Sequence, residues 1–449
     1  MQHAPRTTAL ALGIAGALAF GSVHASGFQL KENSVKGMGQ AFAGIGLDAT
    51  DGSNVVNNPG TLSRVDGTLV QSDLSLIDLN FEFNGGGQDL LGQPLRGGDG
   101  GAAGDLAAVP ALSLVHKFDN GLAVGAMVSA PFGLKTEYDR DWVGRYSGVE
   151  SDVKVINLTL SAGLDVIPDR LSVGGGIVLS RADVTLSRAV DFGAALFGNP
   201  ATRPLPFARP QASDGFAEVS GDDNGMGYVL GVTLTPTDRL SLGLSYQSEI
   251  DYDLEGGADW TVPGNVRAVF DASPATRVLF NDGNVTAKLT TPSTTMATAK
   301  YRFSDAFNLA LTYAETGWES VQEVRIDFVN PDADSVEEFD WDTTRFMSIG
   351  GEWAFSDAWT FRAGYAYDET PTTFRTRTPR LPDEDRRWYS IGATWNFSEQ
   401  LEFNLAYTRI VPDRPQVGII TPAAAGGQRL FGSYDSAVNL FGVSGQYRF

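Results

Sequence analysis

The stretch 240–247, "LSLGLSYQ", alternates apolar and polar residues along its whole length. Its apolar members are Leu240, Leu242, Leu244 and Tyr246. Because successive side chains of a strand point to opposite faces, this stretch predicts a strand with one apolar and one polar face. The same alternation recurs at 156–164 and in the last segment, which ends at Phe449. From about residue 67 onwards, the sequence predicts a succession of such strands.

The connections between these strands have two lengths. Six are short turns, namely "FDNG" at 118, "IPDR" at 167, "TPTDR" at 235, "FSDA" at 303, "FSDA" at 355 and "FSEQ" at 397. Seven are longer polar stretches, near 84–104, 132–150, 188–225, 252–292, 316–340, 369–386 and 410–434. Together they predict fourteen antiparallel strands. Transmembrane barrels keep their short turns on the periplasmic side and their long loops outside.

The first 25 residues predict a secretory signal peptide. They contain Arg6, an apolar run from Ala9 to Phe20 and the small-residue pattern Val23-His24-Ala25 before Ser26. The run is too short to span a bilayer, and no later stretch of about 18 uninterrupted apolar residues predicts a transmembrane helix. These features exclude an inner-membrane helical protein and predict export.

The sequence therefore predicts three parts: a signal peptide (1–25), an N-terminal segment (26–66) and an all-β outer-membrane barrel of fourteen strands (67–449). Both termini are expected on the periplasmic side or inside the barrel. The terminal aromatic strand resembles a signal for the barrel-assembly machinery. A soluble β-sandwich would share the alternation and is the alternative fold.

Composition excludes several function classes. The chain has no cysteine, so it offers no disulfide and no thiol nucleophile, and its net charge of −21 argues against nucleic acid as a partner. After residue 25 its only histidine is His116, which sits beside a periplasmic turn. A catalytic triad or a familiar metal site does not assemble from these residues, so we expect no enzyme activity, no metal and no cofactor.

Residues 26–66 do not alternate. Val35, Met38 and Phe42 can share one side of a short helix, and the residues after them are mostly turn formers. So few apolar groups cannot form a separate core. Because a barrel of this size has a wide interior, we expect the segment to fold inside the lumen as a plug, or hatch. A loose periplasmic extension is the alternative.

Several motifs resemble the outer-membrane long-chain fatty acid transporter family, the FadL type. They are "SGFQLKENSVKGMGQAFAG" from 26, "NNPG" at 57–60, "APFGLKTEYDRDWVGRY" at 130–146 and "YAYDETP…RLPDEDRRWYSIG" from 365 to 392. The resemblance spans 26–449 and implies a hatched barrel that passes hydrophobic molecules by diffusion. The hatch motif Asn58-Pro59-Gly60 has glycine where the family usually has alanine, which would loosen the turn.

The resemblance also implies roles for single residues. Phe28 would occupy a hydrophobic pocket, and a kink in the third strand would open the barrel wall sideways. We assign that gate to Gly104 and Pro110, because proline cannot donate to a sheet ladder. A harmless proline near the rim is the alternative.

External capture is expected in the third and fourth long loops, where ligand first binds in the family. Their aromatic residues include Phe192, Phe197, Phe207, Trp260 and Phe270. Such aromatic surface suggests binding. Alternatively, the two loops pack on each other and form a lid.

Arg181 is the first candidate for binding a ligand carboxylate. Apolar residues occupy odd positions before it and even positions after it, which predicts a β-bulge near Ser180 that turns Arg181 into the lumen. The family has a ligand-binding arginine in a matching segment. Arg345 is a second, weaker candidate, because Asp342 stands where the family has a lysine. An arginine at the outer rim is the alternative for Arg181.

The expected cargo is a long-chain fatty acid or a similar hydrophobic compound. Monoaromatic hydrocarbons, which other family members carry, are the alternative cargo, and a general porin is the alternative function. Acidic clusters at 337–340 and 383–385 are expected to be solvated or bridged by divalent ions to lipopolysaccharide. The resemblance also implies a monomer.

Overall fold

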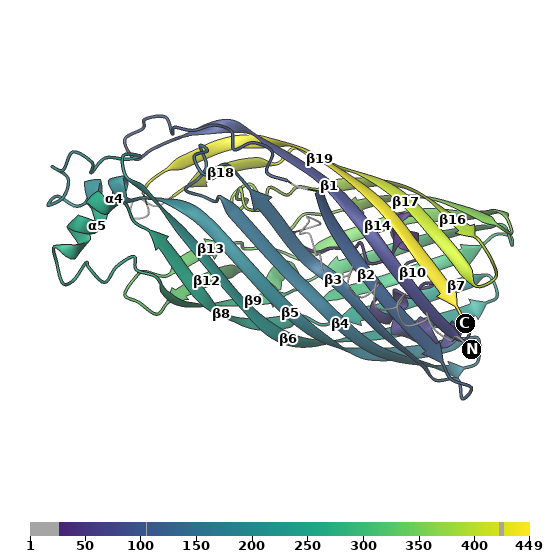
Figure 1. Ribbon diagram of the computed structural model, residues 1–449. Coiled ribbons are helices and arrows are strands. Elements are labelled where there is room, and N and C mark those ends of the chain that lie inside the picture. Colours follow the sequence, from purple (N-terminus) through teal and green to yellow (C-terminus); the bar gives the residue numbers. More distant parts are fainter. Residues whose placement is uncertain (1–26, 105, 422–425) are drawn as a thin grey trace, which may run out of the picture.

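The computed structural model describes residues 27–104, 106–421 and 426–449, so the predicted signal peptide lies outside the described residues. One antiparallel sheet of nineteen segments closes on itself, because β1 pairs with β19 on one side and β2 on the other (Figure 1). No helix in the described ranges is long and apolar enough to cross a membrane.

The segments are β1 (Thr68–Gln88), β2 (Leu106–Lys117), β3 (Ala123–Glu137), β4 (Glu150–Ile167), β5 (Leu171–Asp191), β6 (Asp214–Thr237), β7 (Leu240–Gln247), β8 (Ile250–Thr261), β9 (Gly283–Thr291), β10 (Thr294–Arg302), β11 (Phe307–Thr316), β12 (Glu323–Phe328), β13 (Ser335–Glu338), β14 (Thr344–Ser356), β15 (Trp359–Asp368), β16 (Arg386–Asn396), β17 (Leu401–Pro412), β18 (Gln416–Ile420) and β19 (Arg429–Arg448).

Five of the barrel strands are interrupted, so the nineteen segments form fourteen strands, as predicted. The halves are β7 with β8, β9 with β10, β11 with β12, β13 with β14, and β17 with β18, since both halves of each pair face the same neighbours. All six predicted short turns join neighbouring strands. The chain ends in register, with the Phe449 amide donating to the Thr68 carbonyl at 2.9 Å.

Several of the predicted loops are shorter than predicted, because strands extend into 84–104, 132–150, 316–340 and 410–434 as well as into the two longest loops. β5 continues to Asp191 and β6 begins at Asp214, so the loop predicted at 188–225 is only 192–213. Likewise the loop predicted at 252–292 is 262–282. The short helices α4 (Phe192–Gly198) and α5 (Gly264–Asp271) lie in these two loops, at the end of the barrel opposite the C-terminus (Figure 1).

Residues 27–66 lie inside the barrel, at the end where the chain terminates (Figure 1). The segment contains α2 (Val35–Met38), α3 (Asn54–Asn57) and the 3₁₀ turn η2 (Pro59–Arg64); a further 3₁₀ turn, η3 (Trp318–Ser320), follows β11. α2 packs against β16, β17 and β19, and η2 packs against β4, β5 and β6. We call residues 27–33 the arm and residues 34–66 the base.

Glycines of the barrel wall make room for the base. A β-carbon added to any of them would lie 2.2–2.7 Å from an atom of the base, which is closer than carbon atoms pack. These glycines come from eight strands and are Gly125, Gly163, Gly174, Gly231, Gly350, Gly364, Gly392 and Gly442. We call this set the glycine seat. It lets the backbone of the base approach the wall directly.

Candidate functional site

A cavity of about 100 Å³ lies in the lumen between the base, the arm and the wall. Its apolar lining includes Leu30, Phe42 and Ile45 from the N-terminal segment, and its polar lining is mostly amides and hydroxyls such as Asn57 and Gln247. β3 contributes Ser129, Pro131 and Phe132 to the same lining. The cavity therefore touches both the N-terminal segment and the third strand of the wall.

The third strand is broken beside this cavity. In the ladder between β3 and β4, Ser129 pairs with Asn157 and Phe132 pairs with Val155, so Ala130 and Pro131 together stand opposite Ile156. This is a β-bulge, which bends its strand. On the other edge of β3 the pairing with β2 ends at Leu112 and Val128. Toward the extracellular end, β3 thus separates from β2.

The arm occupies the free edge that this separation leaves. The Leu30 amide donates to the Pro131 carbonyl at 2.7 Å, and the Gly133 amide donates to the Phe28 carbonyl at 2.8 Å. Gln29 forms an isolated β-bridge with Phe132. A strand edge with unpaired N–H and C=O groups is a template for another chain segment, and here the protein's own arm fills it.

An aromatic cage holds the tip of the arm. The Phe28 ring lies 5.0 Å from that of Trp318, 5.6 Å from Phe132 and 6.1 Å from Trp341, measured between centroids. The Gly27 amide donates to Asp383 Oδ2 at 3.0 Å, from the loop at 369–385. The arm therefore reaches through the lumen to a loop that folds in from the extracellular end.

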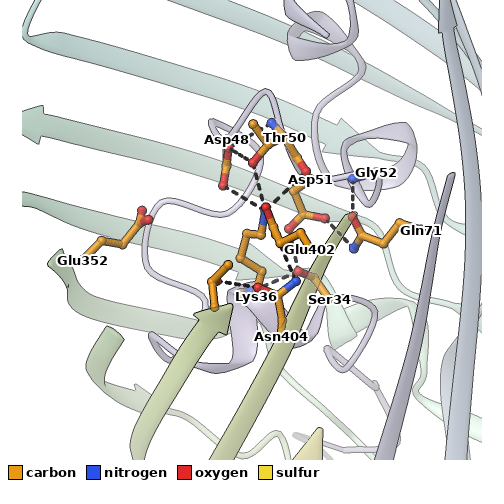
Figure 2. A network of polar contacts seen from close by, with 12 residues as sticks. Ser34, Lys36, Asp48, Thr50, Asp51, Gly52, Gln71, Glu352, Glu402 and Asn404 are labelled. Atoms are coloured by element: carbon orange, nitrogen blue, oxygen red, sulfur yellow. Dashed lines mark hydrogen bonds and ion pairs between the residues drawn. The ribbon is translucent and has the colours of Figure 1, made fainter. Parts of the chain in front are cut away.

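The base is held by a buried ionic network (Figure 2). Lys36 Nζ lies 2.8 Å from Glu402 Oε1 on β17, 2.8 Å from Thr50 Oγ1 and 3.8 Å from Asp48 Oδ2. Burial by itself would lower the pKa of the Lys36 ammonium, but Asp48 and Glu402 raise it above its ordinary value. Lys36 therefore carries a full positive charge that ties the base to the wall.

The base also makes hydrogen bonds to several strands of the wall. The Val35 amide donates to Asp73 Oδ1 on β1 at 2.9 Å, and the Gly44 amide donates to Thr312 Oγ1 on β11 at 2.9 Å. In the Asn58-Pro59-Gly60 motif, Asn58 Nδ2 donates to Thr233 Oγ1 on β6 at 3.0 Å. A β-carbon on Gly60 would lie 2.9 Å from the carbonyl oxygen of Gly231. The glycine of the motif brings the turn close to β6.

The model of the family described as outer membrane protein transport protein (OMPP1/FadL/TodX) matches residues 16–449. This chain belongs to that family. Family membership and the barrel place the protein in the outer membrane.

Solved structures and curated relatives agree with this assignment. The crystal structure of a Pseudomonas aeruginosa FadL homologue has a TM-score of 0.88 at 28% identity, over 94% of this chain and 100% of that chain. A long-chain fatty acid transport protein of Escherichia coli is 27% identical over 397 residues, which are 85% of this chain and 86% of the relative. The Pseudomonas putida toluene transporter TodX shares the fold, with a TM-score of 0.68 at 19% identity over 95% of this chain and 100% of that chain.

In this FadL/TodX-type barrel the bulge predicted at Arg181 is wrong. The registers of β5 with β4 and with β6 run through Ser180 and Arg181 without a shift. Ser180 and Ala182 face inward and are buried, whereas the Arg181 side chain is 52% exposed on the outside and pairs with Asp222 at 2.8 Å. Arg181 is thus an outer-rim residue and does not reach the lumen.

The apolar residues of β5 change faces without a bulge because the surroundings of the two faces exchange along the strand. Nearer the middle of the barrel, Ile177 and Leu179 are exposed on the outer wall. Further along, Val184 packs into the inner apolar cluster around Phe28, while polar residues face outward. Once a strand leaves the lipid, its outer face meets water, so the apolar face changes sides without any bulge.

Arg345 also faces away from the lumen. Its side chain is exposed and lies 3.9 Å from Glu315, between the buried neighbours Thr344 and Phe346. Neither predicted carboxylate partner lines the cavity.

The predicted gate residues belong to the second strand and its approach, because residues 106–117 form β2, which contains Pro110, and Gly104 lies just before it. Pro110 is paired with Leu74 of β1 without a register shift, and it lies in the part of β2 beyond the pairing with β3. Gly104 is packed on β1, where a β-carbon would lie 2.4 Å from the Leu79 carbonyl oxygen. The break in the third strand is at Pro131, which a search for proline within the alternating run after 122 could have found.

The loop aromatics mostly pack on one another. Phe192 is fully buried, with ring centroids 4.9 Å from Phe280 and 5.9 Å from Phe270. Trp260 and Phe207 belong to the same cluster. Phe197 lies outside it, with the Arg203 guanidinium 4.9 Å from its ring.

The acidic cluster at 383–385 is also not a solvated face. Asp383 pairs with Arg386 at 2.9 Å, Glu384 with Arg377 at 2.7 Å, and Asp385 accepts from Tyr367 at 2.5 Å. Sequence reasoning missed Lys31, Trp318 and Trp341. Trp318 lies within the polar stretch at 316–340 and Trp341 directly follows it, and no local pattern reveals that the two meet Phe28.

Proposed function

We propose that this protein carries long-chain fatty acids or similar hydrophobic molecules across the outer membrane and releases them sideways. Ligand enters from the extracellular end, lodges in the lumen cavity and leaves between β2 and β3. The observation that supports this proposal is the position of Pro131, which lines the cavity and lies in the bulge where β3 has left β2. An acyl chain that leaves through the wall avoids water, and exposing it to water would cost about 0.8 kcal/mol of free energy for each CH₂ group.

The firm attachment of the base to the barrel wall favours release of the ligand sideways through the wall and not along the barrel axis into the periplasm. The base rests on the glycine seat and is tied to β17 by the Lys36–Glu402 pair. Removing it from the barrel would break these contacts together. The arm, by contrast, is held to β3 by two main-chain hydrogen bonds and by its aromatic tip.

The size of the cavity supports a role for arm movement. A cavity of about 100 Å³ is too small for a long acyl chain. Withdrawal of the arm would enlarge the cavity and free the edge of β3 in one step. The aromatic cluster of the loops 192–213 and 262–282 would serve for capture, with its rings rearranged around the ligand.

Deletion of Pro131 tests the exit. Without this residue, Ala130 stands opposite Ile156 and the β3–β4 ladder becomes continuous. We expect purified protein to keep binding oleate, while oleate uptake by cells that lack another such transporter falls to background. Pro110→Ala, in a strand paired to β1, is the control and should transport normally. Normal uptake by the deletion variant would exclude release at this bulge.

A second cargo, neutral monoaromatic hydrocarbons, is favoured by one observation. The two arginines expected to bind a carboxylate, Arg181 and Arg345, point outward. Competition of toluene against oleate for the purified barrel distinguishes the two cargoes. A hydrocarbon carrier binds toluene, and a carboxylate on the ligand does not raise its affinity.

A further inference from the structure

The lumen cavity has one charged residue in its lining. Among the described residues that form the cavity, Lys31 alone has an ionisable side chain. The others are apolar residues, amides and hydroxyls, such as Met296, Asn157 and Thr294. Lys31 belongs to the arm and not to the wall. Any charge selectivity of this cavity therefore depends on an ammonium that the N-terminal segment supplies.

The Lys31 ammonium is positioned with hydrogen-bonding capacity left over. Its side chain is 15% exposed, Nζ donates to Gln29 Oε1 at 3.0 Å, and it lies 4.9 Å from the centre of the Phe346 ring. A primary ammonium has three donors. The nearest carboxylate, Asp368 Oδ1, is 3.9 Å away, which is beyond hydrogen-bond distance.

Asp368 does not take the place of a ligand. It does not line the cavity, and it lies opposite Arg386 in the β15–β16 ladder, so it has a second cation beside it. Asp368 balances the charge of Lys31 in the empty cavity without closing a short pair. A carboxylate oxygen arriving from the cavity side would form the shorter, charge-assisted bond.

We propose that Lys31 binds the head group of an anionic amphiphile, a molecule with an acyl chain and a carboxylate; this proposal rests on the proposed transport function. It replaces the roles predicted for Arg181 and Arg345. The head group would thus be bound by the same short arm whose residues Phe28 and Leu30 cover the free edge of β3. Binding of the carboxylate and displacement of the arm become a single event at the exit.

Competition between two ligands of equal chain length tests the assignment. Oleate and oleyl alcohol differ only in the head group, so both are titrated against a fluorescent long-chain fatty alcohol bound to the purified barrel. The variants are Lys31→Met, which removes the charge, and Lys31→Arg, which keeps it. Arg181→Ala is the matched control, a cation of the same chain that faces outward.

The unmodified protein is expected to bind oleate more tightly than oleyl alcohol. Lys31→Met should weaken oleate roughly 10-fold or more, as for loss of a hydrogen bond to a charged group, and leave oleyl alcohol unchanged. Lys31→Arg and Arg181→Ala should retain the preference. Unchanged binding of the alcohol also shows that the variant is folded.

Two results overturn the proposal in different ways. If the unmodified protein prefers oleate and Lys31→Met keeps that preference, Lys31 is not the head-group residue, but fatty-acid transport stands. If the unmodified protein binds neither oleate nor oleyl alcohol, the proposed function itself fails and the assignment of Lys31 fails with it.

Discussion

The arm and the base of the N-terminal segment are adjacent in sequence but held in different ways. The base sits in a seat of glycines from eight strands and carries a buried ion pair between Lys36 and Glu402. The arm extends along one strand edge and ends with Phe28 in an aromatic cage. The base is fixed by shape and charge that involve the whole barrel circumference. The arm is fixed by hydrogen bonds along one strand edge and by the aromatic contacts of Phe28, which a hydrophobic ligand can replace with its own, so the arm is the part suited to move.

Loss of the Lys36 charge should disturb the base most strongly. Lys36→Met leaves Glu402 and Asp48 without their shared cation, and breaking a buried pair typically costs about 3–5 kcal/mol. Amide hydrogen exchange is the measurement. We expect faster exchange at Val35 and Gly44 of the base, whose amides donate to the wall.

The double variant Lys36→Met with Glu402→Gln serves as the matched control, because it removes both partners of the closest pair and should recover part of the protection. Equal protection in Lys36→Met and the unmodified protein would show that the ion pair does not hold the base, and the contrast with the arm would weaken.

Docking near the arm should depend on pH through Glu32. This buried side chain follows Lys31, and burial raises its pKa to about 7, against smaller lowering effects that include the charges of Lys31 and Arg386. Because the folded pKa lies above the unfolded value of 4.5, the docked state binds the extra proton. Protonated Glu32 therefore contributes its full stabilisation of the docked state below about pH 4.5. This contribution, roughly 3 kcal/mol, is lost as the pH rises through about 7.

Exchange at the Leu30 and Gly133 amides, corrected for intrinsic rates, should thus speed up between pH 5 and 8 by more than at Gly44. Glu32→Gln, which cannot ionise, should remove that difference. An arm whose protection is the same at both pH values would rule out Glu32 as its titrating group.

A single methyl group in the seat should have the smallest of these effects. Gly174→Ala places a β-carbon 2.3 Å from the carbonyl carbon of Pro59, and overpacking of this kind costs about 1–3 kcal/mol. We expect a lower thermal midpoint and weaker protection of the base, with the arm unaffected. Gly86→Ala, where no atom lies within 4 Å, is the matched control and should behave as the unmodified protein. No change at Gly174 would mean that the seat is looser than its distances indicate.

Much of the fold could be predicted from the sequence because its causes are local. Strands such as 240–247 can be predicted from the alternation of apolar and polar residues, because a barrel wall has one face toward lipid and the other toward the lumen. Turns such as "FSDA" at 303 and 355 close them for equally local reasons. These two patterns were sufficient for the fourteen strands and for the periplasmic side of the barrel.

The errors share a different cause. The apolar face of a strand predicts lipid contact only within the membrane, and the prediction for Arg181 is wrong because beyond the membrane the outside of the wall meets water while its inside packs into an apolar cluster. The local sequence points to Pro110 because a proline signals a possible break in a strand, while the break itself lies where β3 stops pairing with β2 and the arm fills the edge.

The sequence by itself determined the export of this protein, its alternating strands, its turns and its resemblance to a family that transports hydrophobic compounds, since each of these depends on neighbouring residues. Only the tertiary structure decided which cation faces the cavity, which proline lies at the break, and which glycines seat the base. Those features depend on residues far apart along the chain, such as Lys31 and Asp368 or Phe28 and Trp318, which meet only after the barrel has closed around its own N-terminal segment.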